Sequence, residues 1–269
     1  METPTRLRTD GPLRATLVAI GLTVFGIAAT QFTTLPAFLL EPALIDSPAE
    51  TSIGMRSAFL ALNFLGFVLA GAIYLAATDR GWAYVDLRMP TMRGWLYTLG
   101  GIVGSIAFFV AVSLIIQLVS APTAENQVMD IVGGDQTMVL VMIVIVFFFN
   151  APAEEFLFRN IVQKRLYTAF TRLQSVLVAS LIFALVHFPV YYVTADSLVA
   201  TSVSLSVVFG GSIIFGYLYA KTDNLVVPTV AHAAFNAVQF GLLYLALAYD
   251  IEEAEPAPSL FVDAIVSLL

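Results

Sequence analysis

The chain has 269 residues, of which 59% are hydrophobic and 12% are charged, whereas a soluble globular domain has roughly 45–50% and about 25%. This composition excludes a soluble enzyme and predicts a membrane protein whose spans are roughly 20 apolar residues long. The 19 acidic and 12 basic residues, without a basic run, exclude nucleic acid as a partner, and the lack of cysteine excludes disulfides and thiolate metal sites.

Apolar runs recur along the chain and predict seven transmembrane helices. They cover approximately residues 15–40, 57–77, 94–121, 137–153, 173–192, 198–220 and 225–249. The length and the mean hydropathy of +0.90 admit between six and eight spans. We therefore expect an all-α polytopic helical bundle in the lipid bilayer, with about seven transmembrane helices and eight as the upper count.

Basic residues gather in alternate loops and predict the orientation of the bundle. Short loops rich in Lys and Arg stay in the cytoplasm. The N-terminal segment and the second, fourth and sixth loops hold Arg6, Arg8, Arg14, Arg80, Arg88, Arg93, Arg159, Lys164, Arg165, Arg172 and Lys221. The opposite loops are acidic, with Arg56 as the one basic exception. We expect a multi-pass protein of the cell membrane with its N-terminus inside.

Ionisable residues within the spans are few, and each is a functional candidate because charge in hydrocarbon is costly. Glu154 and Glu155 continue the fourth span, and the two histidines of the chain, His187 and His232, lie in the fifth and seventh spans. Counting the helical rise from the basic end of each span places Glu154, His187, His232 and Asn236 roughly 15–22 Å deep. We expect these side chains to meet near the midplane.

Helical spacing assigns different tasks to the two neighbouring glutamates. Residues four apart share a face, while adjacent residues point about 100° apart. Glu155 can therefore pair with Arg159, which we expect to be buried, and Glu154 is left as a general base. His232 and Asn236, also four apart, can donate to an oxygen that becomes negative during a reaction.

Three motifs occur in order on three apolar helices: Glu154-Glu155-x-x-x-Arg159, Phe183-x-x-x-His187 and His232-x-x-x-Asn236. As a set, they resemble the motifs of the CAAX prenyl endopeptidase and bacteriocin-processing (CPBP/Abi) family of intramembrane proteases, as does the stretch from Lys221 through Pro228 to His232. The resemblance divides the chain into residues 1–136 with three N-terminal transmembrane helices, a protease core over 137–249, and an acidic tail with a short apolar segment over 250–269.

The resemblance implies an intramembrane endopeptidase in which Glu154, with His187, activates a water molecule for attack on a peptide carbonyl. His232 and Asn236 would stabilise the oxyanion. The positions that the family uses to support the site are occupied by Glu155, Arg159 and Phe183. The implied substrate is a membrane-associated peptide or protein, lipidated in some relatives, and we expect it to reach the site from the cytoplasmic half.

Zinc is an alternative to metal-independent chemistry, since members of this family have been described in both classes. His187, His232 and Glu154 could supply three protein ligands and leave the fourth position for water. With Glu154 bound to zinc, however, no second acid would remain as the base, because Glu155 faces Arg159. We therefore favour chemistry without a metal.

Other hypotheses compete with a protease. Glu154, His187 and His232 could line a pathway in a non-enzymatic transporter or proton relay, although the sequence lacks the inverted repeat common in transporters. The chain could also be a degenerate scaffold member of the family, against which the intact motifs argue. The plainest alternatives are a solvated pair of helix-end glutamates and histidines that merely link helices by hydrogen bonds.

Overall fold

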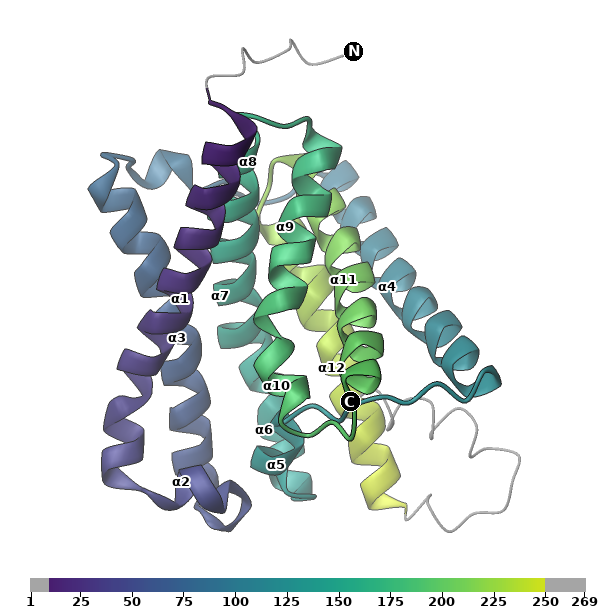
Figure 1. The fold of residues 1–269 in the computed structure, drawn as a ribbon. Helices are drawn as coiled ribbons and strands as arrows, with labels where there is room; N and C mark the ends of the chain where they lie inside the picture. The colour runs from purple at the N-terminus through teal and green to yellow at the C-terminus, as the bar shows by residue number, and fades with distance from the viewer. Residues whose placement is uncertain (1–9, 250–269) are drawn as a thin grey trace.

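The computed structural model describes residues 10–249, so the acidic tail and apolar segment at 250–269, with Arg6 and Arg8, lie outside the described residues. Within them, six helices are long and apolar enough to cross a membrane. These are α1 (Pro12–Leu40), α3 (Ile53–Ala77), α4 (Met92–Leu118), a continuous helix over Gln136–Leu166, α11 (Leu198–Thr222) and α12 (Val226–Ala248). The bundle and its apolar, outward-facing side chains confirm the predicted polytopic helical membrane fold (Figure 1).

The fifth predicted span differs from the others because it is broken. It consists of α9 (Arg172–Val186) and the short α10 (Phe188–Tyr192), with His187 at the junction. Pro189 lies in the first turn of α10, where the missing backbone N–H is not needed for a helical hydrogen bond. In the interior of one continuous helix over α9 and α10, the same proline would remove a hydrogen bond and clash with the preceding turn. The break therefore ends the longer helix at one of the two histidines.

The fourth span continues through Glu154 and Glu155 to about Lys164, as expected, and is the centre of the fold. It runs through α6 (Gln136–Ile145), η3 (Val146–Asn150), α7 (Ala151–Glu155), η4 (Phe156–Gln163) and α8 (Lys164–Leu166). The stretches η3 and η4 are π-helical, a geometry that is rare and frequent at functional sites. The two glutamates lie on α7, between these two stretches.

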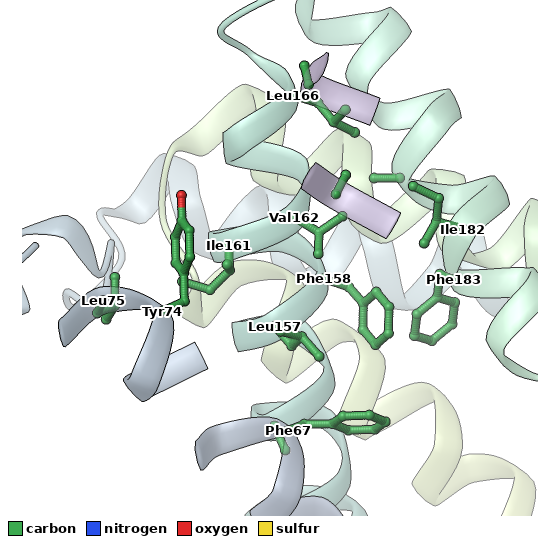
Figure 2. Packing of buried hydrophobic residues seen from close by; sticks show 14 of the residues in the cluster. Phe67, Tyr74, Leu75, Leu157, Phe158, Ile161, Val162, Leu166, Ile182 and Phe183 are labelled. Carbon is green, nitrogen blue, oxygen red and sulfur yellow. The ribbon is translucent and has the colours of Figure 1, made fainter. Parts of the chain in front are cut away.

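Apolar side chains of α1, α3 and α9 bury the central helix. Leu157, Phe158 and Ile161 are fully buried, and Figure 2 shows them between α3 and α9. The ring of Phe158 meets Phe67 at 5.8 Å and Phe183 at 4.9 Å, both edge to face, which is a favoured aromatic geometry. This packing holds α7 and the start of η4 in place.

Helices α1 and α3 form a closely packed pair at one side of the bundle (Figure 1). A Cβ atom on Gly66 would lie only 2.5 Å from the backbone Cα of Thr30. The close approach of the two backbones therefore requires glycine at this position.

The short connecting elements are α2 (Ala43–Asp46), η1 (Pro48–Glu50), η2 (Trp82–Tyr84) and α5 (Val128–Val132). Arg56, the basic exception among the acidic loops, is buried on α3 and binds both α5 and the start of α6. Its guanidinium donates to the carbonyls of Ile131 and Val132 at 3.0 Å and to Asp135 at 2.8 Å. Asp135 also caps α6 by accepting from the backbone N–H of Thr137 and Met138.

A polar chain ties the opposite end of the central helix to its surroundings. Lys164 donates to Asp86 at 2.8 Å, and the same carboxylate accepts from the hydroxyl of Tyr219 at 2.5 Å. The Tyr219 hydroxyl in turn accepts from Asn160 at 3.0 Å. The loop after α3, the central helix and α11 are thereby joined at the end where the basic residues of the described chain gather.

Candidate active site

Glu155 is the centre of a buried ionic cluster on α7. Its Oε2 accepts from Nε of Arg159 at 3.0 Å, and its Oε1 lies 3.0 Å from Nδ1 of His232. Glu155 and Arg159 are fully buried, and a second guanidinium nitrogen donates to Ser212 on α11 at 3.0 Å. The expected ion pair is therefore present, and it balances a charge that would be costly alone at this depth.

The contact with Glu155 determines which nitrogen of His232 carries a hydrogen. A carboxylate paired with an arginine accepts hydrogen bonds, so Nδ1 of His232 must donate. Nε2 then faces the other glutamate and lies 3.9 Å from Oε2 of Glu154. The ring also stacks on Phe215 at 4.7 Å with an interplanar angle of 16°. Both contacts limit rotation of the imidazole.

Glu154 lies on another face of α7 and is held by an amide. The residue is 7% exposed, which does not fit the alternative of a solvated helix-end pair. Nδ2 of Asn150, one turn earlier, donates to Oε1 at 2.9 Å, while Oδ1 of Asn150 accepts from Nδ2 of Asn236 at 2.9 Å. One oxygen of Glu154 is thus anchored, and the other is directed toward His232.

His187 stands at the break between α9 and α10. Its Nδ1 lies 2.9 Å from the carbonyl oxygen of Phe183. A carbonyl only accepts, so Nδ1 carries the hydrogen, and in the neutral ring Nε2 has the lone pair. The Phe183 ring also packs against the imidazole, with centroids 4.7 Å apart. Phe183 therefore contacts His187 through both its backbone and its side chain.

One cavity of about 1120 Å³ joins these groups inside the bundle. Its wall near the site holds Asn150, Glu154, His187, His232 and Asn236, with Phe158, Phe183 and Phe215 beside them. All four residues predicted to act in catalysis therefore line a single space. Of the supporting residues, Phe183 lines it, whereas Glu155 and Arg159 lie behind the wall.

The cavity extends in a direction that differs from the expected access route. It reaches Asp46, Glu50 and Asp130 near α2, η1 and α5, which lie at the end of the bundle opposite the start of α1 (Figure 1). Among the described residues, Lys164 and Arg172 at the basic end do not line it. The open path thus leads away from the half that the basic loops predict to be cytoplasmic.

Three residues of this site, Asn150, Ser212 and Phe215, are absent from the sequence-based prediction. Asn150 bridges Glu154 and Asn236, Ser212 binds Arg159, and Phe215 stacks on His232. Asn150 could have been found, because it lies four residues before Glu154 in a helix and is polar in an apolar span. Nothing in the sequence marks Ser212 or Phe215, since α11 carries many serines and apolar residues.

The proposed zinc ligands do not form a metal site as they are placed. Glu154 and His232 approach each other, while Nδ1 of His187 donates to the Phe183 carbonyl and leaves Nε2 as the nitrogen that could bind a metal. Across residues 10–249, no group of three His, Asp or Glu side chains is close enough to hold a metal ion. As they are placed, His187, His232 and Glu154 are therefore not gathered into a three-ligand centre.

Comparison with known protein families gives a match over part of the chain. Residues 136–238 match the model of the family described as type II CAAX prenyl endopeptidase Rce1-like. No curated protein and no solved structure matches the chain. The matched segment begins at the start of α6 and ends within α12, so it contains all three motifs and the polar residues of the cavity wall near the site: Asn150, Glu154, His187, His232 and Asn236. Over residues 136–238 the chain is thus similar to the Rce1-like family of type II CAAX prenyl endopeptidases, as the resemblance of its motifs predicted.

Proposed function

We propose that the protein is an intramembrane endopeptidase that hydrolyses a peptide bond of a membrane-associated substrate with a water molecule activated by Glu154. The observation that carries this proposal is the convergence of Glu154, both histidines and Asn236 on one cavity within membrane-length helices. The match to a CAAX protease family supports the same activity.

Glu154 is the group best placed to take a proton from water. Asn150 anchors Oε1, and Oε2 is free to accept a hydrogen bond from a water molecule in the cavity. As the water oxygen attacks the peptide carbonyl carbon, its proton passes to Glu154 and the carbonyl π electrons move to oxygen. Collapse of this intermediate breaks the C–N bond, and the proton passes on to the leaving amine. Nε2 of His187, which keeps its lone pair, is available to orient the water.

Asn236 and His232 are the proposed donors to the oxyanion, and they differ in the hydrogen that each has available to donate. The Asn236 amide has two hydrogens, of which one binds Asn150, so the second is free to donate. His232 already uses its Nδ1 hydrogen on Glu155. It therefore donates through Nε2 only when it carries a second proton, as an imidazolium.

The rest of the cavity suits an apolar or lipidated peptide. Its walls carry aromatic side chains from α3, α4 and α12, among them Phe59, Phe64, Phe108 and Phe240. Such a surface favours the burial of hydrocarbon. We propose that the substrate enters from the end formed by α2, η1 and α5 and presents its peptide bond to Glu154.

Peptide cleavage by the purified protein in detergent tests this function. A panel of lipidated and unlipidated peptides is incubated with wild type, Glu154→Gln, and wild type with a zinc chelator. Glu125→Gln is a matched control, because it makes the same change at an exposed carboxylate outside the cavity. We expect cleavage in the wild type, in the control and with chelator, and none in Glu154→Gln.

Other outcomes contradict parts of the proposal. Loss of cleavage with chelator, restored by added zinc, would overturn the metal-independent mechanism. Full activity of Glu154→Gln would overturn the role of this residue. If no peptide in the panel is cleaved, the transporter and scaffold hypotheses gain support.

A further inference from the structure

Asn150 holds two proposed catalytic residues at once. It is the last residue of η3 and is partly buried at the cavity wall. Its Nδ2 donates to Oε1 of Glu154, and its Oδ1 accepts from Nδ2 of Asn236, both at 2.9 Å. Asn236 is 86 positions away along the chain, so this bond also joins α12 to the start of α7.

We propose that Asn150 is a positioning residue that orients the carboxylate of Glu154 and the amide of Asn236 relative to each other. This inference rests on the proposed function, in which Glu154 accepts the proton and Asn236 donates to the oxyanion. Asn150 joins these two residues in one hydrogen-bonded unit. Asn150 acts through its two neighbours and needs no contact with the reacting atoms.

The amide group is required because it is a donor at one end and an acceptor at the other. An aspartate at this position would keep the bond from Asn236 but could not donate to Glu154 as a carboxylate, and it would add a like charge beside it. A leucine of similar size would lose both bonds. The Asn150→Asp and Asn150→Leu variants therefore remove different parts of the same unit.

The chain contains a matched control for the Asn-to-Asp change. Oδ1 of Asn224 accepts from the backbone N–H of Val226 at 3.0 Å, just before α12. This bond needs only an acceptor, and a negative charge is favourable at a helix N-terminus. Asn224→Asp should therefore keep its bond, whereas Asn150→Asp should not.

The first test is the separation of kcat from KM with a cleavable peptide. We expect Asn150→Asp and Asn150→Leu to lower kcat by about 10- to 100-fold, since misplacement of a catalytic group has effects of this size, and to leave KM nearly unchanged. Adding Asn236→Ala to Asn150→Leu should cost much less than Asn236→Ala costs alone, because the two residues act as a unit. Asn224→Asp should retain the wild-type kcat.

The second test does not need catalysis. The infrared band of the Glu154 carboxyl group is identified by its loss in Glu154→Gln, and it should shift in both Asn150 variants but not in Asn224→Asp. An unshifted band overturns the proposal even if the protein cleaves no peptide. A wild-type kcat in Asn150→Asp overturns it as well. A shifted band in a protein without peptidase activity would instead support the positioning role while the proposed function fails.

Discussion

Glu155 accepts a hydrogen bond from Nδ1 of His232 at 3.0 Å, across 77 positions of the chain. Spacing along α7 predicts only the pair of Glu155 with Arg159, but the carboxylate uses its second oxygen to orient the histidine. A carboxylate behind a functional histidine determines both the tautomer and the ring orientation. The ionic cluster therefore has a structural role and a positioning role.

Breaking the buried pair should destabilise the protein. Arg159→Met leaves the Glu155 carboxylate without its cation, and Glu155→Gln leaves the guanidinium without its anion, which typically costs about 3–5 kcal/mol. Thermal unfolding in detergent measures the effect. Arg14→Met is the control, because it removes an exposed partner of Asp10, and surface pairs contribute little. Wild-type melting temperatures for both cluster variants would contradict the pairing.

Removal of an oxyanion donor should affect turnover more than substrate affinity. We expect Asn236→Ala and His232→Phe to lower kcat by about 10²–10³-fold, as for other lost donors, with little change in KM. His232→Phe retains a ring to stack on Phe215, so a folded protein is expected. Steady-state kinetics with a peptide substrate decide the matter, and a rise in KM at constant kcat would identify these residues as substrate-binding groups instead.

A methyl group at Gly66 should disturb the α1–α3 pair. The added Cβ would lie 2.5 Å from the backbone nitrogen of Thr30, and a backbone cannot move aside as a side chain can. Overpacking of this kind costs about 1–3 kcal/mol. Gly100→Ala provides the comparison, because a Cβ there meets nothing within 4 Å and alanine favours a helix. Thermal unfolding should rank Gly66→Ala below wild type and Gly100→Ala at or above it.

Acid should remove the contribution of Asp135 to stability. The backbone N–H of Met138, together with Arg56, holds the pKa of Asp135 below its ordinary value of 3.8. The unfolded chain therefore binds a proton at a higher pH than the folded chain does. The contribution of Asp135 to stability is complete above the ordinary pKa, and it is lost as pH falls through the lower pKa of the folded state.

The comparison with Asp135→Asn isolates this effect, since asparagine still caps a helix but does not pair with Arg56 as an anion. Melting temperatures are measured for both proteins from neutral to acid pH. The difference between them should be constant near neutrality and shrink below about pH 4. A difference that does not depend on pH would show that the charge of Asp135 contributes nothing.

The membrane class, the helices and the identity of the motif residues were predictable from local properties. Apolar run length follows from bilayer thickness, and the Glu155–Arg159 pair follows from helical geometry over one turn. The break at His187 was harder to predict, because the run over 173–192 is largely apolar and Pro189 alone does not show that the helix ends there. Spacing also does not give the mutual distances of His187, His232 and Glu154, which within residues 10–249 are not gathered as a metal-binding group.

The sequence by itself determined which residues could carry chemistry, because charge and polarity are rare in hydrocarbon and each exception is visible. Only the tertiary structure decided how they are joined: His232 to Glu155, and Asn236 through Asn150 to Glu154. It also decided that the cavity leads toward α2 and α5. These relationships depend on the rotation and depth of α12 against α7, and helix-to-helix packing sets both, whereas the period of a single helix sets neither.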